Sequence, residues 1–274
     1  MKALIKKIIL KFIQKTIFIS RNKNTLRTIL DMIVDENKNS IRTLSLKNKN
    51  LRFFEINAIT KYRNDTFFEK EPETLNWINS FDKSSHFWDI GANVGLYSIY
   101  AAIVKNCNVC AFEPSVFNLE LLAKNINLNS LTDQINIFPI ILSDKQSIGT
   151  FSNSSLANGA ALSSLIKSSK SDQELKSKCV YKMPVFQLDS ICEIYKIKKP
   201  RYLKIDVDGL EYSIIKGGRS ILKNIKSLLI EIDNEQPLTK KNIFKILEEE
   251  GFYLEENKID HIVSKTLNQI WHKK

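Results

Sequence analysis

Carboxylates and glycines stand at the ends of short apolar runs, and their spacing gives the first sign of chemistry in this chain. Asp89 lies near the end of one run and precedes a turn that contains Gly91 and Gly95. A second run ends in Glu113, 22 residues after Gly91. Glycines permit a sharp turn and a close backbone approach to a ligand, and an acid at the following strand end suits a ribose diol. Residues 86–115 therefore predict a nucleoside-binding β-α-β unit.

Three further apolar runs also end in or near carboxylates, at Ser143-Asp144, Asp206–Asp208 and Glu231–Asp233. In an open parallel sheet, ligands bind outside the carboxyl ends of the strands. Acids gathered at one edge repel each other and lower stability, so their presence at five strand ends indicates a functional site.

The turn after the first run distinguishes between ligands. A dinucleotide site has the pattern GxGxxG, whereas here Asp89 precedes the first glycine and Asn93 stands where the second would be. A carboxylate at this place repels a pyrophosphate and attracts a cation such as an ammonium or a sulfonium. S-adenosylmethionine carries both cations and a ribose, so it is the predicted cofactor.

Residues 87–236 resemble the FkbM-type family of S-adenosylmethionine-dependent methyltransferases. The resemblance rests on the order and spacing of WDIGANVGLYS, AFEPSVFNLELLAKNINLN, LSD at 142–144, LDS at 188–190, LKIDVDGLEYSIIKGG at 203–218 and LLIEID at 228–233. It implies a Rossmann-like fold and O-methylation of hydroxyls, on a sugar of a glycan, a lipid-linked saccharide or a related metabolite. The family usually reads KIDVEG, so Asp208 replaces a glutamate and has a shorter reach.

The resemblance also implies roles for individual residues. It assigns the methionine portion of the cofactor to Asp89, Gly91, Asn93 and Gly95, the ribose to Glu113, the border of the adenine to Ser143 and Asp144, and the reacting methyl group to Asp206. A hydroxyl acceptor must lose a proton, to a base or as a metal-bound alkoxide. The candidate carboxylates are Asp206, Asp208 and Glu211, which could act directly or hold a magnesium-like ion.

Each of these candidates has a structural alternative. Asp206 could cap the following helix, and Glu211 could pair with Lys204 or Lys216 on the surface. His261 is an alternative general base if the terminal hairpin faces the cleft. The Cys107–Cys110 spacing has no second cysteine or histidine pair to complete a zinc site, so no metal site is assigned and the thiols are expected in the core.

Alternating apolar runs and amphipathic segments predict an α/β fold, doubly wound, with a mostly parallel seven-stranded sheet. The expected strands are 87–90, 109–112, 135–142, 202–205 and 227–232, followed by an antiparallel hairpin of 252–255 and 261–264. Helices are expected at about 72–81, 96–104, 116–127, 211–222 and 240–250. A polar stretch at about 145–185 interrupts the alternation, and its length predicts a substrate-side insertion or lid.

The basic charge of the chain belongs to its beginning. Residues 1–52 hold 13 Lys and Arg against 3 Asp and Glu, whereas the rest is almost balanced. Residues 3–19 alternate apolar and lysine faces and predict an amphipathic helix, which could lie on an anionic membrane or pack on the body or on a second subunit. We therefore expect a basic extension over 1–70, with short strands near 44–46 and 51–56, and a catalytic domain over 71–274. The expected location is cytoplasmic, at most peripheral on the inner membrane face.

Two other classes of function compete with the methyltransferase. An NAD(P)-dependent sugar oxidoreductase or epimerase would need the missing GxGxxG and a Tyr-x-x-x-Lys pair. A non-catalytic, membrane-tethered nucleoside-binding protein would leave the carboxylates unexplained. The balanced charge of the body argues against a nucleic-acid partner, and a small-molecule or glycan acceptor is expected instead. Self-association remains an alternative use of the N-terminal helix.

Overall fold

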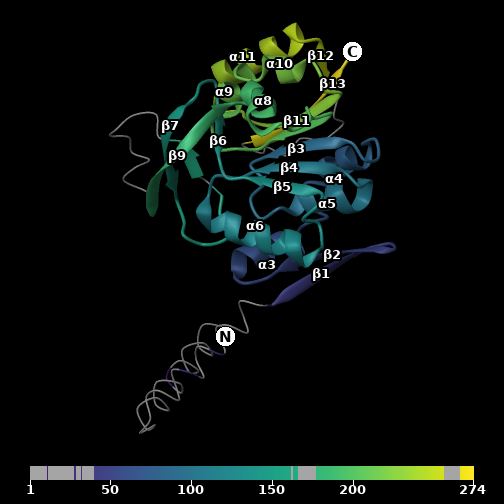
Figure 1. Ribbon diagram of the computed structural model, residues 1–274, viewed down its shortest axis with the longest axis vertical. Coiled ribbons are helices and arrows are strands. Elements are labelled where there is room, and N and C mark those ends of the chain that lie inside the picture. The colour runs from purple at the N-terminus through teal and green to yellow at the C-terminus, as the bar shows by residue number, and fades with distance from the viewer. Residues whose placement is uncertain are drawn as a thin grey trace.

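The computed structural model describes residues 40–161, 163–165, 177–255 and 266–274, with isolated positions 11, 28 and 32. Its centre is a seven-stranded sheet in the order β12-β13-β11-β10-β3-β4-β5 (Figure 1). The strands are β3 (His86–Ile90), β4 (Asn108–Phe112), β5 (Ile135–Phe138), β10 (Tyr202–Ile205), β11 (Ser227–Asp233), β12 (Phe252–Leu254) and β13 (Thr266–Lys273).

Five of these strands run parallel, and the C-terminal pair is antiparallel. β3 pairs with both β4 and β10, so the strand order reverses between β3 and β10. This reversal is the topological switch point, where sheets of this kind bind ligands. The predicted doubly wound sheet with a terminal hairpin is confirmed. The second strand of this hairpin is Thr266–Lys273, and the predicted segment 261–264, with His261, lies outside the described residues.

Helices cover both faces of the sheet. The elements are α5 (Leu96–Lys105), α6 (Val116–Leu128), η1 (Leu188–Ser190), α8 (Ile191–Tyr195), α9 (Glu211–Lys216), α10 (Arg219–Leu222) and α11 (Pro237–Glu249). Successive strand residues point to opposite faces. Phe87 accordingly packs in the core with α5 and α6, and Trp88 in the core with α9, α10 and α11. Both side chains are fully buried, so this strand is apolar on both faces, as expected for a central parallel strand.

The predicted strand 135–142 is two strands in different sheets. β5 ends at Phe138, and β6 (Ile141–Ser143) leaves the main sheet after Pro139. Proline has no N–H to donate to a strand ladder, which explains the break at this place. β6 belongs to a four-stranded sheet in the order β6-β9-β7-β8, built mainly by the insertion: β7 (Ser147–Asn153), β8 (Ser163–Leu165) and β9 (Cys179–Gln187).

Residues 40–85, the continuously described part of the chain before the main sheet, form a hairpin and two helices: β1 (Ile41–Leu46), β2 (Lys49–Phe54), α3 (Ala58–Asp65) and α4 (Pro72–Asn79). The predicted strand pair and the helix at 72–81 are thus confirmed. The side chain of Asn125 on α6 accepts a hydrogen bond from the Phe54 N–H at 2.9 Å, which joins β2 to α6. Asn57 and Thr60 form a capping box that starts α3.

The predicted amphipathic helix at 3–19 lies outside the described residues. None of the helices that the structure describes is long and apolar enough to cross a membrane. The division at residue 70 remains a prediction.

Candidate active site

A cavity of about 240 Å³ opens at the carboxyl ends of β3, β4 and β10, at the switch point of the sheet. Four parts of the chain form its wall: the turn at residues 91–95 between β3 and α5 (the first turn), the ends of neighbouring strands, the insertion at about 145–185, and the region around α3. The residues that line it include Arg63, Thr66, Phe67, Lys70, Glu71, Gly91, Asn93, Leu96, Tyr97, Phe112, Glu113, Asn118, Ile140, Leu142, Phe151, Ala160, Ser163, Lys204, Asp206, Asp208, Ile214 and Glu231.

Gly91 joins the first turn to the end of β10. Its φ is +85°, and a Cβ at this position would lie 1.8 Å from the backbone oxygen of Asp206. The Asp206 N–H donates to the Ile90 oxygen at 3.0 Å in the same region. Only glycine permits both this conformation and this approach, so Gly91 brings the first turn and Asp206 together. Gly95 allows close packing on α6 instead, because a Cβ at this position would lie 2.5 Å from the Leu122 side chain.

Glu113 is held as a carboxylate acceptor at the end of β4. Its Oε2 accepts from the Asn93 N–H at 2.8 Å, and its Oε1 accepts from the Ser115 N–H at 2.8 Å and the Asn118 amide at 3.4 Å. Burial nevertheless raises the pKa of Glu113 to about 7, despite these hydrogen bonds. A carboxylate has about four acceptor positions. Oε2 therefore keeps capacity for a hydroxyl of a bound ribose.

Residues 157–161 of the insertion cross the cavity wall beside Glu113. The Ala160 oxygen accepts from the side-chain amides of Asn93 at 2.9 Å and Asn118 at 3.2 Å. The Gly159 N–H donates to the Asn118 Oδ1 at 2.8 Å, and the Asn57 amide donates to the Asn158 oxygen at 3.0 Å. This part of the insertion therefore borders the cavity and is fixed to α3, α6 and the turn at residues 91–95, while its predicted role toward a substrate remains a prediction.

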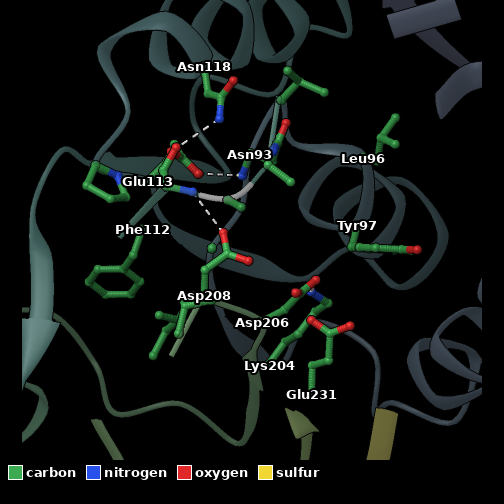
Figure 2. Close-up of a pocket in the computed structure, with 18 of the residues that line it drawn as sticks. Asn93, Leu96, Tyr97, Phe112, Glu113, Asn118, Lys204, Asp206, Asp208 and Glu231 are labelled. Atoms are coloured by element: carbon green, nitrogen blue, oxygen red, sulfur yellow. Dashed lines mark hydrogen bonds and ion pairs between the residues drawn. The ribbon is translucent and has the colours of Figure 1, made fainter. Parts of the chain in front are cut away.

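The other end of the cavity is a charged cluster around a buried lysine. Lys204 Nζ lies 2.5 Å from Asp206 Oδ2 and 5.1 Å from the centre of the Tyr97 ring. The Tyr97 hydroxyl donates to Glu71 at 2.8 Å. Figure 2 shows Lys204 and Asp206 together with Glu231, apart from the group of Glu113, Asn93 and Asn118. Carboxylates outnumber cations at this end, which favours a positively charged ligand.

The charges of this cluster determine its ionisation. Burial opposes charge on Asp206, but the Lys204 ammonium outweighs it and lowers the pKa of Asp206. Burial likewise opposes charge on Lys204, but Asp206, Asp89 and Glu71 raise its pKa. Burial and the neighbouring Glu71 raise the pKa of the Tyr97 hydroxyl. Asp206 is therefore ionised and Tyr97 is a proton donor at neutral pH.

Asp89 lies beneath the first turn and does not line the cavity. Its side chain is buried, and its Oδ2 accepts from the Ser98 hydroxyl at 2.6 Å. Burial raises the pKa of Asp89, against the effect of Lys204. Asp89 is therefore coupled electrostatically to Lys204 and joined to α5 through Ser98, while its predicted role toward the cofactor remains a prediction.

Ser143, Asp144 and Glu211 also stand outside the cavity wall. Asp144 pairs with Lys216 at 2.8 Å, and Ser143 packs its backbone against Gly217, where a Cβ would come within 2.3 Å. Their neighbour Leu142 lines the cavity instead, with the apolar side chains of Phe112, Ile140, Phe151 and Ile214. This apolar wall can cover an aromatic base.

The side chain of Glu211 contacts the loop that immediately precedes α9 and not the cavity. Its Oε1 accepts from the Gly209 N–H at 3.2 Å, and burial raises its pKa to about 7. It pairs with neither Lys204 nor Lys216, whose partners are Asp206 and Asp144. Asp208 does line the cavity, where its Oδ2 accepts from the Ser163 N–H at 3.0 Å. The three candidate carboxylates after β10 thus have three different surroundings.

Helix α5 begins at the cavity. Its first intrahelical bond runs from the Ile99 N–H to the Gly95 oxygen, so the earlier N–H groups have no partner inside the helix. Leu96 and Tyr97, at this end, line the cavity. The partial positive charge of a helix N-terminus favours a carboxylate. The cavity therefore provides surroundings for each part of S-adenosylmethionine: an apolar wall, an acid for a ribose, a helix end for a carboxylate and acids for the cations.

Several site residues are missed by sequence reasoning. Glu71 and Tyr97 line the cavity, and Lys204 reaches into the charged cluster from the middle of β10. The signal that could have found Lys204 is its place inside an otherwise fully buried strand. A lysine there must have carboxylate partners, since an uncompensated buried charge is costly. In the part of the chain that is described, no group of three or more His, Cys, Asp or Glu has the arrangement of a metal site.

Residues 89–254 match the family described as the methyltransferase FkbM domain. A hexuronic acid methyltransferase, AglP of Haloferax volcanii, is 23% identical over 186 residues, which cover 67% of this chain and 70% of that protein.

Two solved structures are also similar. The FkbM methyltransferase of Methylobacillus flagellatus has a TM-score of 0.48 at 14% identity and covers 90% of this chain and 59% of that one. The precorrin-6y C5,15-methyltransferase of Geobacter metallireducens has a TM-score of 0.45 at 15% identity and covers 75% of this chain and 88% of that one.

The chain belongs to the FkbM methyltransferase family, because the family match spans more than half of its length. It is an S-adenosylmethionine-dependent methyltransferase. This membership argues against the oxidoreductase and the non-catalytic alternatives.

Proposed function

We propose that this protein transfers a methyl group from S-adenosylmethionine to a hydroxyl of a sugar. The observation that carries the proposal is the pair of Lys204 and Asp206 at the switch point, inside the cavity. A sugar acceptor is supported by the similar hexuronic acid methyltransferase. The carboxylates around Lys204 favour a cationic methyl donor over a phosphate-bearing cofactor.

The donor carries the methyl group on a sulfonium sulfur. When the methyl group is transferred, the rest of the donor is released as a neutral thioether. Glu113 binds the ribose hydroxyls through the free capacity of Oε2, and the side chains of Phe112, Ile140 and Leu142 cover the adenine. The start of α5 holds the amino-acid carboxylate of the donor. Because the leaving group is already activated, most of the rate acceleration comes from these residues fixing the two reactants in line.

Asp206 accepts the proton of the acceptor hydroxyl. As the new C–O bond forms, the acceptor oxygen becomes positive and its proton becomes acidic, so an ordinary carboxylate is a sufficient base. Lys204 keeps Asp206 ionised and in place, and Asp206 remains 32% exposed toward the cavity. Asp208 borders the acceptor beside Ser163, whereas Glu211 supports the loop between β10 and α9 through the Gly209 N–H.

Product analysis tests this function. The protein is incubated with S-adenosylmethionine carrying a labelled methyl group and with fractionated envelope glycans and lipid-linked saccharides. We expect label in a sugar methyl ether that survives mild alkaline hydrolysis. Label only in an alkali-labile methyl ester, or only in non-carbohydrate material, would contradict a sugar hydroxyl as acceptor. A parallel reaction with EDTA tests the predicted involvement of a divalent ion. Loss of methyl transfer in EDTA would indicate that such an ion assists Asp206.

The N-terminal basic segment is proposed to bring the enzyme to membrane-bound acceptors. Sedimentation with anionic liposomes, comparing the full chain with one lacking residues 1–40, tests this proposal. Equal binding by the two proteins would reject it. Analytical ultracentrifugation of the same pair tests whether the segment instead holds two subunits together.

A further inference from the structure

Part of the cavity wall comes from outside the region that matches the family. The match to the FkbM family begins at residue 89. The cavity is nevertheless also lined by residues that precede it: Arg63, Thr66, Phe67, Lys70 and Glu71. Arg63 and Thr66 are half-buried and Lys70 is exposed, whereas Glu113 and Lys204 are buried. The region around α3 therefore forms the outer rim of the cavity, where an acceptor has to enter.

Arg63 is held at this rim in a fixed orientation. Its Nε donates to the Gly159 oxygen at 2.7 Å. The φ of Gly159 is +82°, a backbone conformation that favours glycine, so Gly159 lets the insertion turn at the point where its oxygen meets Arg63. A guanidinium has five N–H donors, of which this bond uses one. The outer edge, with its two amino groups, is the edge that binds carboxylates in a fork.

Arg63 differs from the other two cations of the cavity wall. Lys204 pairs with Asp206 at 2.5 Å, and Lys70 pairs with Glu71 at 2.7 Å. Arg63 forms no ion pair with any residue of the described ranges. A half-buried guanidinium oriented by a backbone oxygen and lacking a carboxylate partner has the chemistry of a receptor for an external anion.

The carboxylate of the methyl donor does not need Arg63. The N-terminus of α5, with Leu96 and Tyr97 at the cavity, already provides N–H groups and a favourable dipole for it. An anionic acceptor, in contrast, meets a cavity in which Glu71, Asp206 and Glu231 would repel it. A cation at the entrance is what such an acceptor requires.

We propose that Arg63 binds a carboxylate of the acceptor, so that the acceptor is a sugar acid methylated on one of its hydroxyls. This inference rests on the proposed function and specifies its substrate class. Arg63 orients the sugar through a charge-assisted fork at the rim, and the hydroxyl to be methylated faces Asp206. Arg63 thus determines specificity between acidic and neutral sugars.

Binding to the protein saturated with S-adenosylhomocysteine tests the inference. Calorimetric titrations use glucuronic and galacturonic acids, each against its neutral amide, at constant ionic strength. We expect at least one acid to bind about ten to a hundred times more tightly than its amide, the range of a charge-assisted hydrogen bond. Arg63→Gln should abolish this preference, and Arg63→Lys should restore part of it because it keeps the charge and loses the fork.

Lys61→Gln is the matched control. Lys61 lies on the same helix, pairs with Asp65 at 3.1 Å and does not line the cavity. Its replacement by glutamine therefore removes one positive charge, as Arg63→Gln does, without changing the rim. It should keep the preference for the acid. Equal binding of acids and amides by the natural protein, or no binding of either, would overturn the inference. A weakening of S-adenosylhomocysteine binding in Arg63→Gln as large as that of the acid would assign Arg63 to the donor and also overturn it.

Failure of the inference is distinguishable from failure of the proposed function. Methyl ethers formed on neutral sugars, with no preference for acids, would retain the function and reject the role of Arg63. A preference for acids without any sugar methyl ether in the product analysis would reject the function itself.

Discussion

The ammonium of Lys204 lies 2.5 Å from the carboxylate of Asp206, and the lysine side chain is only 1% exposed. Lys204 stands in the middle of a buried strand, and Asp206 follows directly after that strand, at the switch point. A lysine charge removed from water in this way is costly unless a carboxylate compensates it, and Asp206, itself 32% exposed, supplies that carboxylate. The same contact therefore supports the fold of the sheet and fixes the carboxylate that faces the acceptor.

Replacing Lys204 by methionine should destabilise the protein strongly. The substitution leaves Asp206 without its buried partner, and loss of one member of a buried pair typically costs about 3–5 kcal/mol of unfolding free energy. Urea denaturation measures the effect. Lys226→Met, which breaks an exposed pair with Asp82, is the control and should cost about 1 kcal/mol or less. Equal losses in the two variants would show that the Lys204 pair does not stabilise the sheet.

The contribution of this pair should depend on pH in a defined direction. The folded pKa of Asp206 is lowered, so its stabilisation is present above the unfolded value of 3.8 and is lost as the pH falls through the folded pKa. The folded pKa of Lys204 is raised, so its stabilisation is present below 10.5 and is lost as the pH rises through the folded pKa. The stability difference between the natural protein and Lys204→Met should therefore be greatest between these values. A difference that is constant from pH 3 to pH 11 would contradict the assignment.

Binding of S-adenosylhomocysteine should strengthen as the pH rises through about 7. Burial raises the pKa of Glu113 to about 7, and only its ionised form offers all its oxygen acceptors to a ribose. Calorimetric titrations from pH 5.5 to pH 8.5 measure this dependence. Glu113→Gln should bind more weakly at pH 8.5 and show a flatter pH profile. An unchanged profile in that variant would assign the titration to another group.

Gly91→Ala should damage both folding and cofactor binding, and Gly209→Ala is its matched comparison. Both glycines have a positive φ, at +85° and +89°, but a Cβ at 91 would lie 1.8 Å from the Asp206 oxygen whereas nothing lies within 4 Å of a Cβ at 209. Gly209→Ala should cost about 1–2 kcal/mol from backbone strain alone. Gly91→Ala should cost more and weaken S-adenosylhomocysteine binding, as measured by urea denaturation and calorimetry. Similar values for the two variants would mean that the contact with Asp206 is unimportant.

The strand ends were predictable because their pattern depends only on local sequence. Apolar runs that end in an acid or a glycine define both the strands and the edge where the site lies. Gly91, Asn93, Glu113, Asp206 and Asp208 are indeed brought to one cavity.

The limits of sequence reasoning have physical causes. Lys204 stands alone as a charged residue in an apolar strand, so no sequence pattern marks it as a site residue. Its role depends on carboxylates that other elements contribute, such as Glu71 and Asp89. Ser143 and Asp144 do not line the cavity because Ser143 packs against Gly217 and Asp144 pairs with Lys216, contacts that periodicity does not reveal. Arg63 and Glu71 precede the region with family motifs, and they join the site through contacts with distant residues: Arg63 with the Gly159 oxygen and Glu71 with the Tyr97 hydroxyl.

The most direct test of the account is the single-turnover rate of methyl transfer by Asp206→Asn, measured with S-adenosylhomocysteine affinity on the same protein. Asp82→Asn, which removes a surface carboxylate 48% exposed, is the control. We expect a rate about a hundred to ten thousand times lower for Asp206→Asn, the usual contribution of a general base, and S-adenosylhomocysteine binding within a few-fold of the natural protein. A rate equal to that of Asp82→Asn would contradict Asp206 as the group that accepts the proton.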